Sequence, residues 1–385
     1  MVGERLVVVL GMHRSGTSAV TRALMALGAE LGDSLLLAQK ENPKGFFEDS
    51  DLNSLNIEML GAIGQRWDSL SSVEASHIDR LWQLGLGEKA ARILDQKLSV
   101  HPIFAFKDPR VAKLLGFWQR VFEELGLDVS YLLVLRNPLS VAQSLAARDG
   151  FSREKSYALW LGHVLDSLFK TSGKPRTLAE FDIFMDDPER ELRRMADELS
   201  FEVDEHELDV FVSGFLEENL RHTRFDAAAL LGDPSCSPFV FEVYSNLATL
   251  GHRGSHPMEI PLEMVGNWRN TMAILEMTFK TVDAIESRAD ALKSELNALC
   301  GQLAQREASA EQLMDTLELQ KEMVSRLENA ISEREHNIAE LSGSVDSLEG
   351  RLADIYSSTS WKITAPFRAW STTLSKAFGK KRLRS

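Results

Sequence analysis

The feature that most constrains this 385-residue sequence is an unbroken apolar repeat toward its C-terminal end. From Val282 to Ile355, apolar side chains recur at spacings of alternately three and four residues. A strict 3.5-residue repeat predicts a left-handed coiled coil, because it keeps one seam of the helix facing its partner. At about 1.5 Å per residue, such a rod is on the order of 110 Å long. A single solvated helix folded against a domain is the alternative, but it would not need an unbroken seam.

Three polar residues interrupt the seam, all at the heptad d position and 14 residues apart: Arg306, Gln320 and Arg334. Polar seam residues lower stability, and a role for these three in fixing register or strand number is a hypothesis. We expect the chain to form a homo-oligomer through this seam. Leucine is frequent at both a and d, so the sequence does not decide between a dimer and a trimer.

The N-terminal part has a different texture. Short apolar runs at residues 6–10, 103–106 and 131–135, and a weaker one at 176–181, alternate with helical patterns at 18–28, 111–125, 140–147 and 155–169. Continuous apolar runs indicate strands that are buried on both faces of a parallel sheet. The sequence therefore predicts an α/β domain with three layers, of the kind that carries a phosphate-binding P-loop, followed by a long coiled-coil helix.

We divide the chain into four parts: an α/β domain (1–230), a connector rich in Gly, Pro and Ser (231–275), the coiled coil (276–356) and a tail (357–385). The last 25 residues carry seven Lys or Arg and no acid, with apolar residues at helical spacing: Phe367, Trp370, Leu374 and Phe378. A basic amphipathic helix of this kind often lies on an anionic membrane. Docking on a protein and a frayed, solvated tail are the alternatives.

Composition excludes several classes of protein. The formal net charge of −14 disfavours a nucleic-acid binder. The two cysteines, Cys236 and Cys300, have no metal-ligand spacing, so neither a zinc site nor a disulfide framework is expected. No apolar run approaches the roughly 20 residues that span a bilayer, and the run near the N-terminus is too short for a signal peptide. We expect a cytoplasmic protein, with peripheral attachment to the inner membrane as the alternative that the tail allows.

The stretch GMHRSGTS (residues 11–18) lies between the first strand and the first helix. Backbone N–H groups and hydroxyls at such a turn bind phosphate. Thr17 stands where nucleotide-hydrolysing loops have lysine, and no strand ending in Asp supplies a Mg²⁺ ligand. The loop therefore predicts a phosphate site without a metal, and a purely structural turn is the alternative. Its candidate binding residues are Arg14, Ser15, Gly16, Thr17 and Ser18.

Two more strands end in a cation. Lys107, in FKDPR, follows the second strand, and Arg136 follows the third. Ser144 comes eight residues after Arg136, two turns along the next helix. Because the carboxyl ends of parallel strands meet at one edge of a sheet, these side chains should lie near the glycine loop, and Arg136 and Ser144 could bind a second phosphate there. A surface arginine beside a capped helix is the alternative.

The order of GMHRSGTS, NPKGFFED, FKDPR and LVLRNPLSVAQSL resembles the sulfotransferases that use 3′-phosphoadenosine 5′-phosphosulfate (PAPS), over roughly residues 5–225. The resemblance implies that the loop holds the 5′-phosphosulfate, with Arg14 at the family's basic position. It implies that Arg136 and Ser144 hold the 3′-phosphate. Lys107 matches a lysine of tyrosylprotein sulfotransferases that stabilises the transferring sulfuryl group. No metal is needed.

The resemblance also implies a general base, Glu or His, beyond the first helix. In NPKGFFEDSDLN (42–53), Glu48 is the first choice, and Asp49 is an alternative that could instead cap the next helix. His13 is a lesser candidate for the base or for a substrate contact, and Lys44 is a candidate for the acceptor side.

The segment SSTSWKITAPFRAW (357–370) resembles one that follows coiled coils in bacterial glycosyltransferases of surface-polysaccharide assembly. It implies polysaccharide-assembly proteins as partners and a cell-surface glycan as acceptor. The expected function is thus transfer of sulfate from PAPS to a hydroxyl group. Two alternatives are a P-loop kinase of a small molecule, and a coiled-coil scaffold with an inactive nucleotide-binding domain. The sequence does not identify the acceptor.

Overall fold

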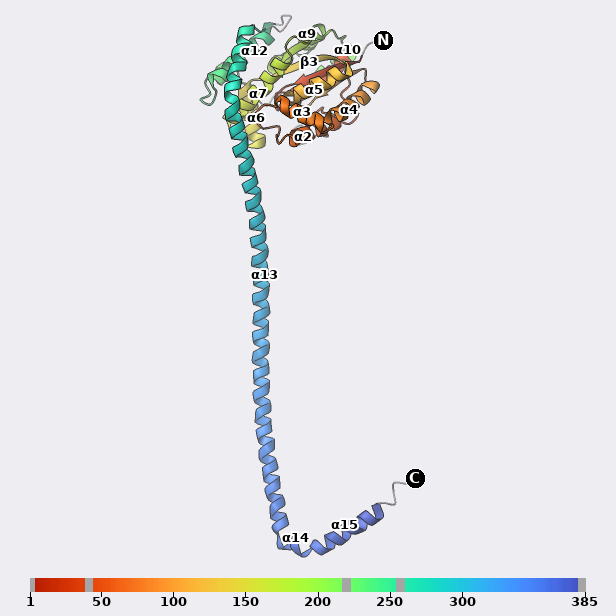
Figure 1. Ribbon diagram of the computed structural model, residues 1–385, viewed down its shortest axis with the longest axis vertical. Coiled ribbons are helices and arrows are strands. Elements are labelled where there is room, and N and C mark those ends of the chain that lie inside the picture. The colour runs from red at the N-terminus through yellow and green to blue at the C-terminus, as the bar shows by residue number, and fades with distance from the viewer. Residues whose placement is uncertain (1–3, 39–43, 217–222, 254–259, 380–385) are drawn as a thin grey trace. The chain divides into compact units, whose positions relative to one another are not determined.

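The computed structural model describes residues 4–38, 44–216, 223–253 and 260–379. The chain divides into two compact units, Met1–Ala289 and Asp290–Ser385. The first unit contains the sheet and the helices packed around it, and the second consists of helices (Figure 1).

The first unit is built on a four-stranded parallel sheet with the strand order β2-β1-β3-β4. All four predicted strands are present: β1 (Arg5–Leu10), β2 (Ile103–Lys107), β3 (Asp128–Leu135) and β4 (Arg176–Glu180). Val9 of β1 lies opposite Lys107, and Leu10 lies opposite Leu133, so the carboxyl ends of the three strands meet at one edge. The predicted fold class, an α/β domain followed by a long helix, is confirmed.

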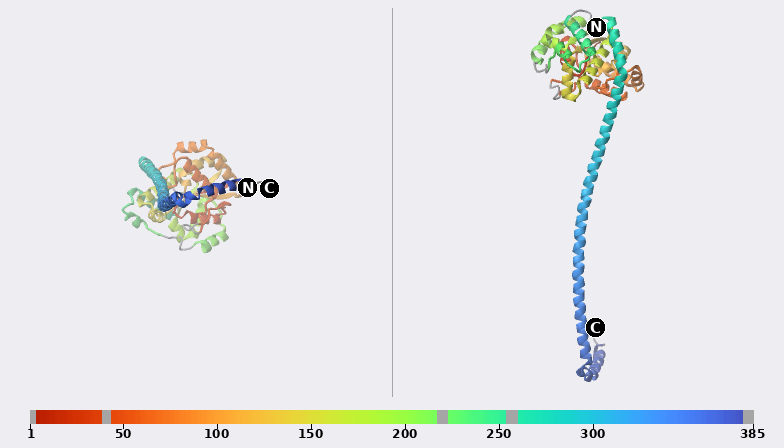
Figure 2. Two further views of the ribbon diagram at one scale, coloured as in Figure 1. Left: turned by 90° about the horizontal axis from the view of Figure 1, so that it is seen from below. Right: turned by 90° about the vertical axis from the view of Figure 1, so that its left-hand side faces the viewer.

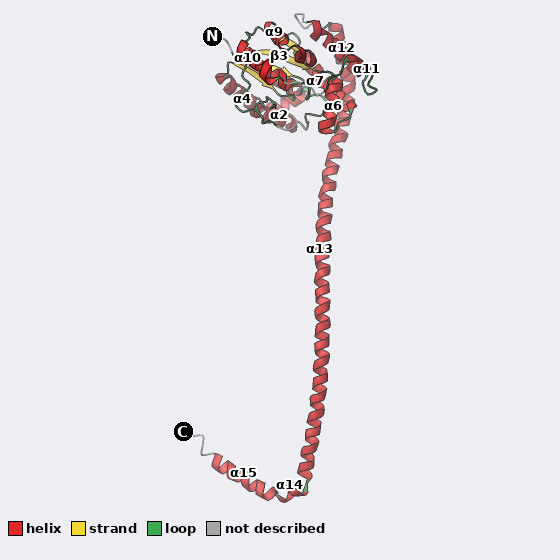
Figure 3. Ribbon diagram, turned by 180° about the vertical axis from the view of Figure 1, so that it is seen from behind, coloured by secondary structure: helices red, strands yellow, loops and turns green. Residues whose placement is uncertain are grey.

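Both faces of the sheet are covered by helices, which surround the strands in Figure 3. Leu6 and Val8 of β1 share a core with α5 (Val111–Leu125) and α7 (Arg153–Lys170). Val7 and Val9 point to the other face, where they share a core with α1 (Thr17–Ala23) and α9 (Pro188–Leu199). Successive strand residues thus enter opposite cores, which is why the strands read as continuous apolar runs.

Outside the sheet, the longer elements described in the first unit are helices. Val243, Leu247 and Trp268, from the part of the chain that we predicted as a connector, are buried in the larger of the two cores. The remaining elements are η1 (a 3₁₀ turn, Leu24–Leu27), α2 (Ser50–Ala62), α3 (Ala75–Gln83), α4 (Leu86–Val100), α6 (Pro138–Asp149), α8 (Phe181–Asp186), α10 (Glu205–Asp209), η2 (a π-helical turn, Val210–Phe215), α11 (Ala227–Leu231) and α12 (Pro238–Arg253).

The long helix α13 (Leu262–Ser357) is continuous over 96 residues (Figure 2). Its first part, residues 262–289, belongs to the first unit, and we call it the foot of α13. Trp268 and Phe279 of the foot are buried, and Val282, the first residue of the heptad seam, also packs against the core. Beyond the foot the seam leucines stay open: Leu317 is 51% exposed and Leu327 57%.

The tail continues as α14 (Thr359–Ile363) and α15 (Ala365–Gly379). The Arg368 guanidinium lies 3.4 Å from the centre of the Trp361 ring. Phe367 and Trp370 are 73% and 70% exposed. The side chains of Leu374 and Phe378, which complete the predicted apolar face, lie outside the described part of the chain. Among the helices that the structure describes, none has the length and hydrophobicity to cross a membrane.

We predict that lysine at seam positions weakens self-association of the full chain, because burying a charge in the seam is costly. Leu317→Lys combined with Leu327→Lys should lower the mass measured by light scattering toward that of one chain. Gln312→Lys combined with Leu319→Lys adds the same charge at heptad position c, outside the seam, and should leave the mass unchanged. Equal masses for both variants would show that the seam does not hold the copies together.

Candidate functional site

The glycine loop between β1 and α1 is tightly constrained. Gly16 has a φ of 84°, and a Cβ there would lie 2.0 Å from the ring of Phe181. A Cβ on Gly11 would lie 2.8 Å from Cγ2 of Thr17. Arg14 has a φ of 68°, a left-handed conformation that costs a residue other than glycine about 1–2 kcal/mol. Strain of this kind persists only where surrounding contacts hold the backbone, and it is common at binding sites.

Arg14 and Arg136 meet at this edge of the sheet. Nε of Arg14 donates a hydrogen bond of 2.7 Å to Oγ of Ser144 on α6. Nη1 of Arg136 donates one of 2.9 Å to the carbonyl oxygen of Arg14, and its guanidinium lies 4.7 Å from the centre of the Phe181 ring. Arg136 is only 6% exposed. The structure thus brings together Arg14, Arg136 and Ser144, with the serine hydroxyl bonded to Arg14.

The hydroxyl of Ser15 is buried in the loop without a hydrogen-bond partner among the described residues, as expected for a group that binds a ligand. Ser15 is 1% exposed, and its Oγ has no hydrogen-bond partner among the described residues. A buried hydroxyl without a partner costs about 1–3 kcal/mol, which a ligand oxygen would offset. Oγ of Ser18 donates a bond of 3.2 Å to the carbonyl oxygen of Phe46, and Thr17 begins α1 as a buried residue. Among these hydroxyls, that of Ser15 is therefore the one that a phosphate oxygen could satisfy without breaking a bond to another described residue.

Lys107 and Glu48 form a buried ion pair beside the loop. Nζ of Lys107 lies 2.6 Å from Oε1 of Glu48 and 3.4 Å from Oγ of Ser18. Burial raises the pKa of Glu48; the charge of Lys107 opposes this rise, and the nearby carboxylate of Asp108 adds to it. A carboxylate with a raised pKa is a better proton acceptor, which suits a general base.

Asparagines of α2 link Glu48 to a second carboxylate. Nδ2 of Asn53 donates to Oε2 of Glu48 at 2.9 Å and to Oδ2 of Asp108 at 3.2 Å. Asn56 donates to the same Asp108 oxygen at 3.0 Å, and Nη1 of Arg110 donates to Oδ1 of Asp108 at 3.0 Å. Sequence reasoning missed these four residues. The spacing of Asn53 and Asn56, one helical turn apart, and the charged residues within FKDPR were the available signals.

The other candidates near Glu48 have structural partners. Asp49 caps α2 by accepting hydrogen bonds from the N–H groups of Asp51 and Leu52, and it lies 2.8 Å from Nζ of Lys97. Nζ of Lys44 donates a 2.6 Å bond to the carbonyl oxygen of Phe215. Asn42 and Pro43, from the same motif, lie outside the described residues.

His13 lies inside the loop as a neutral imidazole. Its ring centre is 4.4 Å from that of Trp67, and its Nε2 is buried without a hydrogen-bond partner among the described residues. Burial lowers the pKa of His13 well below its ordinary value, and the positive charges of Arg110 and Arg148 lower it further. At neutral pH, His13 therefore adds no charge to the site.

Glu180, at the end of β4, is a further buried acid that sequence reasoning missed. Glu180 is 4% exposed. Its Oε2 accepts a 2.8 Å hydrogen bond from the N–H of Ile183, and the Glu180 side chain thereby caps α8. Burial raises the pKa of Glu180 to about 7, against the effect of the Ile183 bond. Its position as the last residue of a strand, at the sheet edge where the other candidates lie, is the signal that could have identified it.

Within the described residues, no group of three or more His, Cys, Asp or Glu side chains is arranged to hold a metal ion. No protein-family model matches the chain, and no curated protein matches it.

The solved structures that are similar to this chain include two sulfotransferase domains. A sulfotransferase domain from the Synechococcus PCC 7002 olefin synthase aligns with a TM-score of 0.35 and 13% identity, over 70% of this chain and 95% of that chain. A sulfotransferase domain from the curacin biosynthetic pathway aligns with a TM-score of 0.34 and 12% identity, over 71% of this chain and 98% of that chain. At these scores the similarity identifies no family for the chain.

We predict that Glu180→Gln stabilises the protein at high pH. The folded-state pKa of Glu180, about 7, lies above its ordinary value of 4.5, so the stability of the neutral form is present below pH 4.5 and is lost as the pH rises through 7. Urea unfolding at pH 8 should show a gain of about 3 kcal/mol for the variant, with little gain at pH 4.5.

The control is Glu88→Gln on α4, where the side chain is 80% exposed. This variant should change stability equally little at both pH values. A Glu180→Gln effect that does not depend on pH would contradict the assigned pKa.

Proposed function

We propose that this chain is a sulfotransferase that moves a sulfuryl group from PAPS to a hydroxyl group, with a glycan as acceptor. The observation that carries the proposal is the position of Lys107. Thr17 occupies the place of the lysine in nucleotide-hydrolysing loops, but Lys107 brings an amine to 3.4 Å from Oγ of Ser18, from the neighbouring strand. The loop thus has a cation beside it that is also paired with a buried acid, Glu48.

The residues at the sheet edge suit the two anionic ends of PAPS. Arg14, Ser15, Gly16, Thr17 and Ser18 would hold the 5′-phosphosulfate. The Ser15 hydroxyl, which has no partner in the described part of the chain, supports this assignment. Arg136 and Ser144 would hold the 3′-phosphate. Because Arg14 is bonded to both Ser144 and Arg136, binding at either end would fix the other. When bound, PAPS supplies an activated sulfuryl group on a phosphate leaving group.

Glu48 is proposed as the general base. It accepts the proton of the acceptor hydroxyl, and the acceptor oxygen then forms the new bond to sulfur while the bond from sulfur to the phosphate oxygen breaks. Asn53 fixes the orientation of the Glu48 carboxylate through its 2.9 Å bond. Lys107 and Arg14 donate hydrogen bonds where negative charge develops, and stabilisation of this kind needs no metal ion.

The glycan acceptor and the place of action depend on the tail. The resemblance of residues 357–370 to segments of polysaccharide-assembly enzymes supports a glycan. The exposed Phe367 and Trp370 on a basic helix support attachment at an anionic membrane surface or to assembly proteins. Sedimentation of the full chain with anionic vesicles tests the membrane attachment.

Two other functions remain as alternatives from the sequence. A small-molecule kinase would need an ATP site, and an inactive scaffold would need no general base. The buried Glu48–Lys107 pair favours an active enzyme over a scaffold, because a buried ion pair without a function is costly to keep.

We predict that Glu48→Gln lowers kcat for transfer of radiolabelled sulfate from PAPS into a glycan extract by at least about 100-fold, because the amide cannot accept the proton. The matched control is the neighbouring Asp49→Asn, which keeps the helix cap, loses the charge paired with Lys97, and should lower stability while leaving kcat nearly unchanged. Undiminished transfer by Glu48→Gln would remove Glu48 from the mechanism, and no transfer by the unaltered protein would refute the proposed function.

We predict that Arg136→Ala abolishes binding of adenosine 3′,5′-bisphosphate in calorimetry, because the 3′-phosphate loses its charged partner. Arg120→Ala, a change at a half-exposed arginine of α5, is the control and should bind as the unaltered chain does. Binding of ATP instead of the bisphosphate would favour the kinase.

A further inference from the structure

The segment from Arg66 to Glu74, between α2 and α3, receives hydrogen bonds from a buried lysine of α5. We call this segment the Trp67 loop. Nζ of Lys113, on α5, donates to the carbonyl oxygens of Ser69 at 2.6 Å and Ser71 at 2.9 Å. Lys113 is 6% exposed, and burial lowers its pKa to about 8. The carbonyl side of the loop is therefore tied to the core of the first unit.

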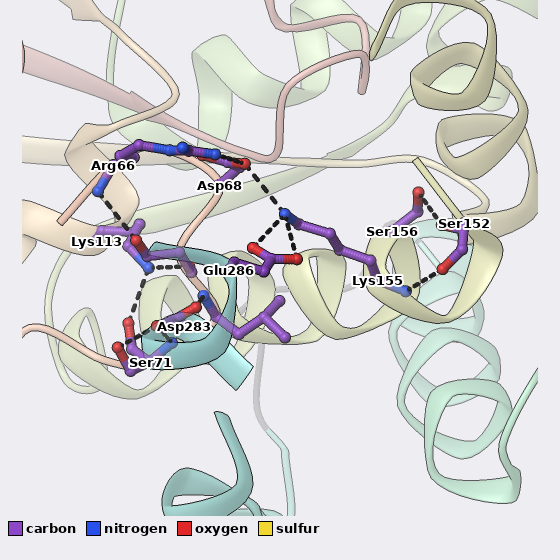
Figure 4. A network of polar contacts seen from close by, with 11 residues as sticks. Arg66, Asp68, Ser71, Lys113, Ser152, Lys155, Ser156, Asp283 and Glu286 are labelled. Atoms are coloured by element: carbon purple, nitrogen blue, oxygen red, sulfur yellow. Dashed lines mark hydrogen bonds and ion pairs between the residues drawn. The ribbon is translucent and has the colours of Figure 1, made fainter. Parts of the chain in front are cut away.

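The N–H side of the Trp67 loop is held by the foot of α13 (Figure 4). Asp283 accepts hydrogen bonds from the backbone N–H of Leu70 at 2.7 Å and of Ser71 at 2.9 Å, and from the Ser71 hydroxyl at 2.5 Å. Glu276 accepts from both the N–H and the hydroxyl of Ser72 at 3.0 Å. Two carboxylates of one helix thus satisfy three successive N–H groups. Bonds to charged acceptors contribute more than neutral ones.

A third connection runs through α7. Nζ of Lys155 lies 3.1 Å from Oδ2 of Asp68, next to Trp67 in the chain, and 2.7 Å from Oε2 of Glu286 on the foot (Figure 4). Lys155 therefore joins α7, the Trp67 loop and α13 at one point. Asp68 also accepts from Arg66, so its buried carboxylate is paired on two sides.

Trp67 itself reaches the glycine loop. Its ring centre lies 4.4 Å from that of His13 and 5.6 Å from that of Phe151, and the Arg148 guanidinium lies 5.2 Å from it. Trp67 thus packs against His13, the residue of the glycine loop that directly precedes Arg14. A shift of the Trp67 loop would uncover His13.

We infer that Asp283 and Glu276, on the foot of α13, are positioning residues that hold Trp67 against His13 and so fix the glycine loop. The helix that carries the heptad seam then also completes the site, and the site needs the foot in place. The link to the glycine loop stands on geometry alone. Its effect on sulfate transfer rests on the proposed function.

The test is hydrogen–deuterium exchange of the full chain without any substrate, so that it does not depend on sulfotransferase activity. Asp283→Ala should speed amide exchange at Leu70, Ser71 and in peptides covering residues 11–18 by at least tenfold, since the loop loses its charged acceptor. The control is Asp315→Ala, at an exposed outer position of the same helix, which should leave exchange unchanged in both regions. Faster exchange at 70–71 with an unchanged glycine loop would overturn the inference.

A shape-preserving variant guards against simple unfolding. Asp283→Asn keeps one acceptor oxygen, so its exchange in residues 11–18 should lie between that of the unaltered chain and that of Asp283→Ala. The same order should appear in the affinity for adenosine 3′,5′-bisphosphate. If the amide exchange rates of Asp283→Asn equal those of the unaltered chain, both at residues 70–71 and at 11–18, the negative charge of Asp283 does not hold the loop in position.

Discussion

The site depends on one constraint, the parallel pairing of β1 between β2 and β3. This pairing places Lys107 opposite Val9 and carries Arg136 past the end of β3, to the same edge as the glycine loop. In an antiparallel arrangement the neighbouring strand would end at the opposite edge, and its cation would be far away. The sheet also buries both of its faces, so little freedom remains for the loop, and Arg14 is kept in a strained conformation.

The charges gathered at this edge are costly and each has a partner. Glu48 and Lys107 are both buried, and taking such a pair out of water is favourable only when further hydrogen bonds satisfy the remaining atoms. Asn53 donates such a bond to Oε2 of Glu48, and Nζ of Lys107 donates one to Oγ of Ser18. The same logic explains the raised pKa of Glu48. Desolvation outweighs the attraction of Lys107, so the carboxylate gains affinity for a proton while staying in place.

Much of this could be predicted because the signals are local. An apolar run followed by a glycine loop, and a cation after each strand, predict the sheet, its edge and the residues Arg14, Lys107 and Arg136. Hydrogen bonds between residues far apart in the sequence leave no local pattern from which they could be predicted. Asp283 and Ser71 are 212 residues apart, and each reads as an ordinary surface residue in its own segment. The heptad pattern likewise does not reveal that its first residue, Val282, packs against the core of the first unit.

The burial of Trp268 and Phe279 also bears on how such proteins are assembled from parts in evolution. A gene fusion that joined the sheet domain to a different rod at residue 230 would expose core side chains and leave the N–H groups of Leu70 and Ser71 without acceptors. Recombination at Ala289 would preserve them, because the compact unit ends there. The exchangeable module is therefore the α/β domain together with the foot of its helix, and relatives with other rods should retain an acid at the position of Asp283.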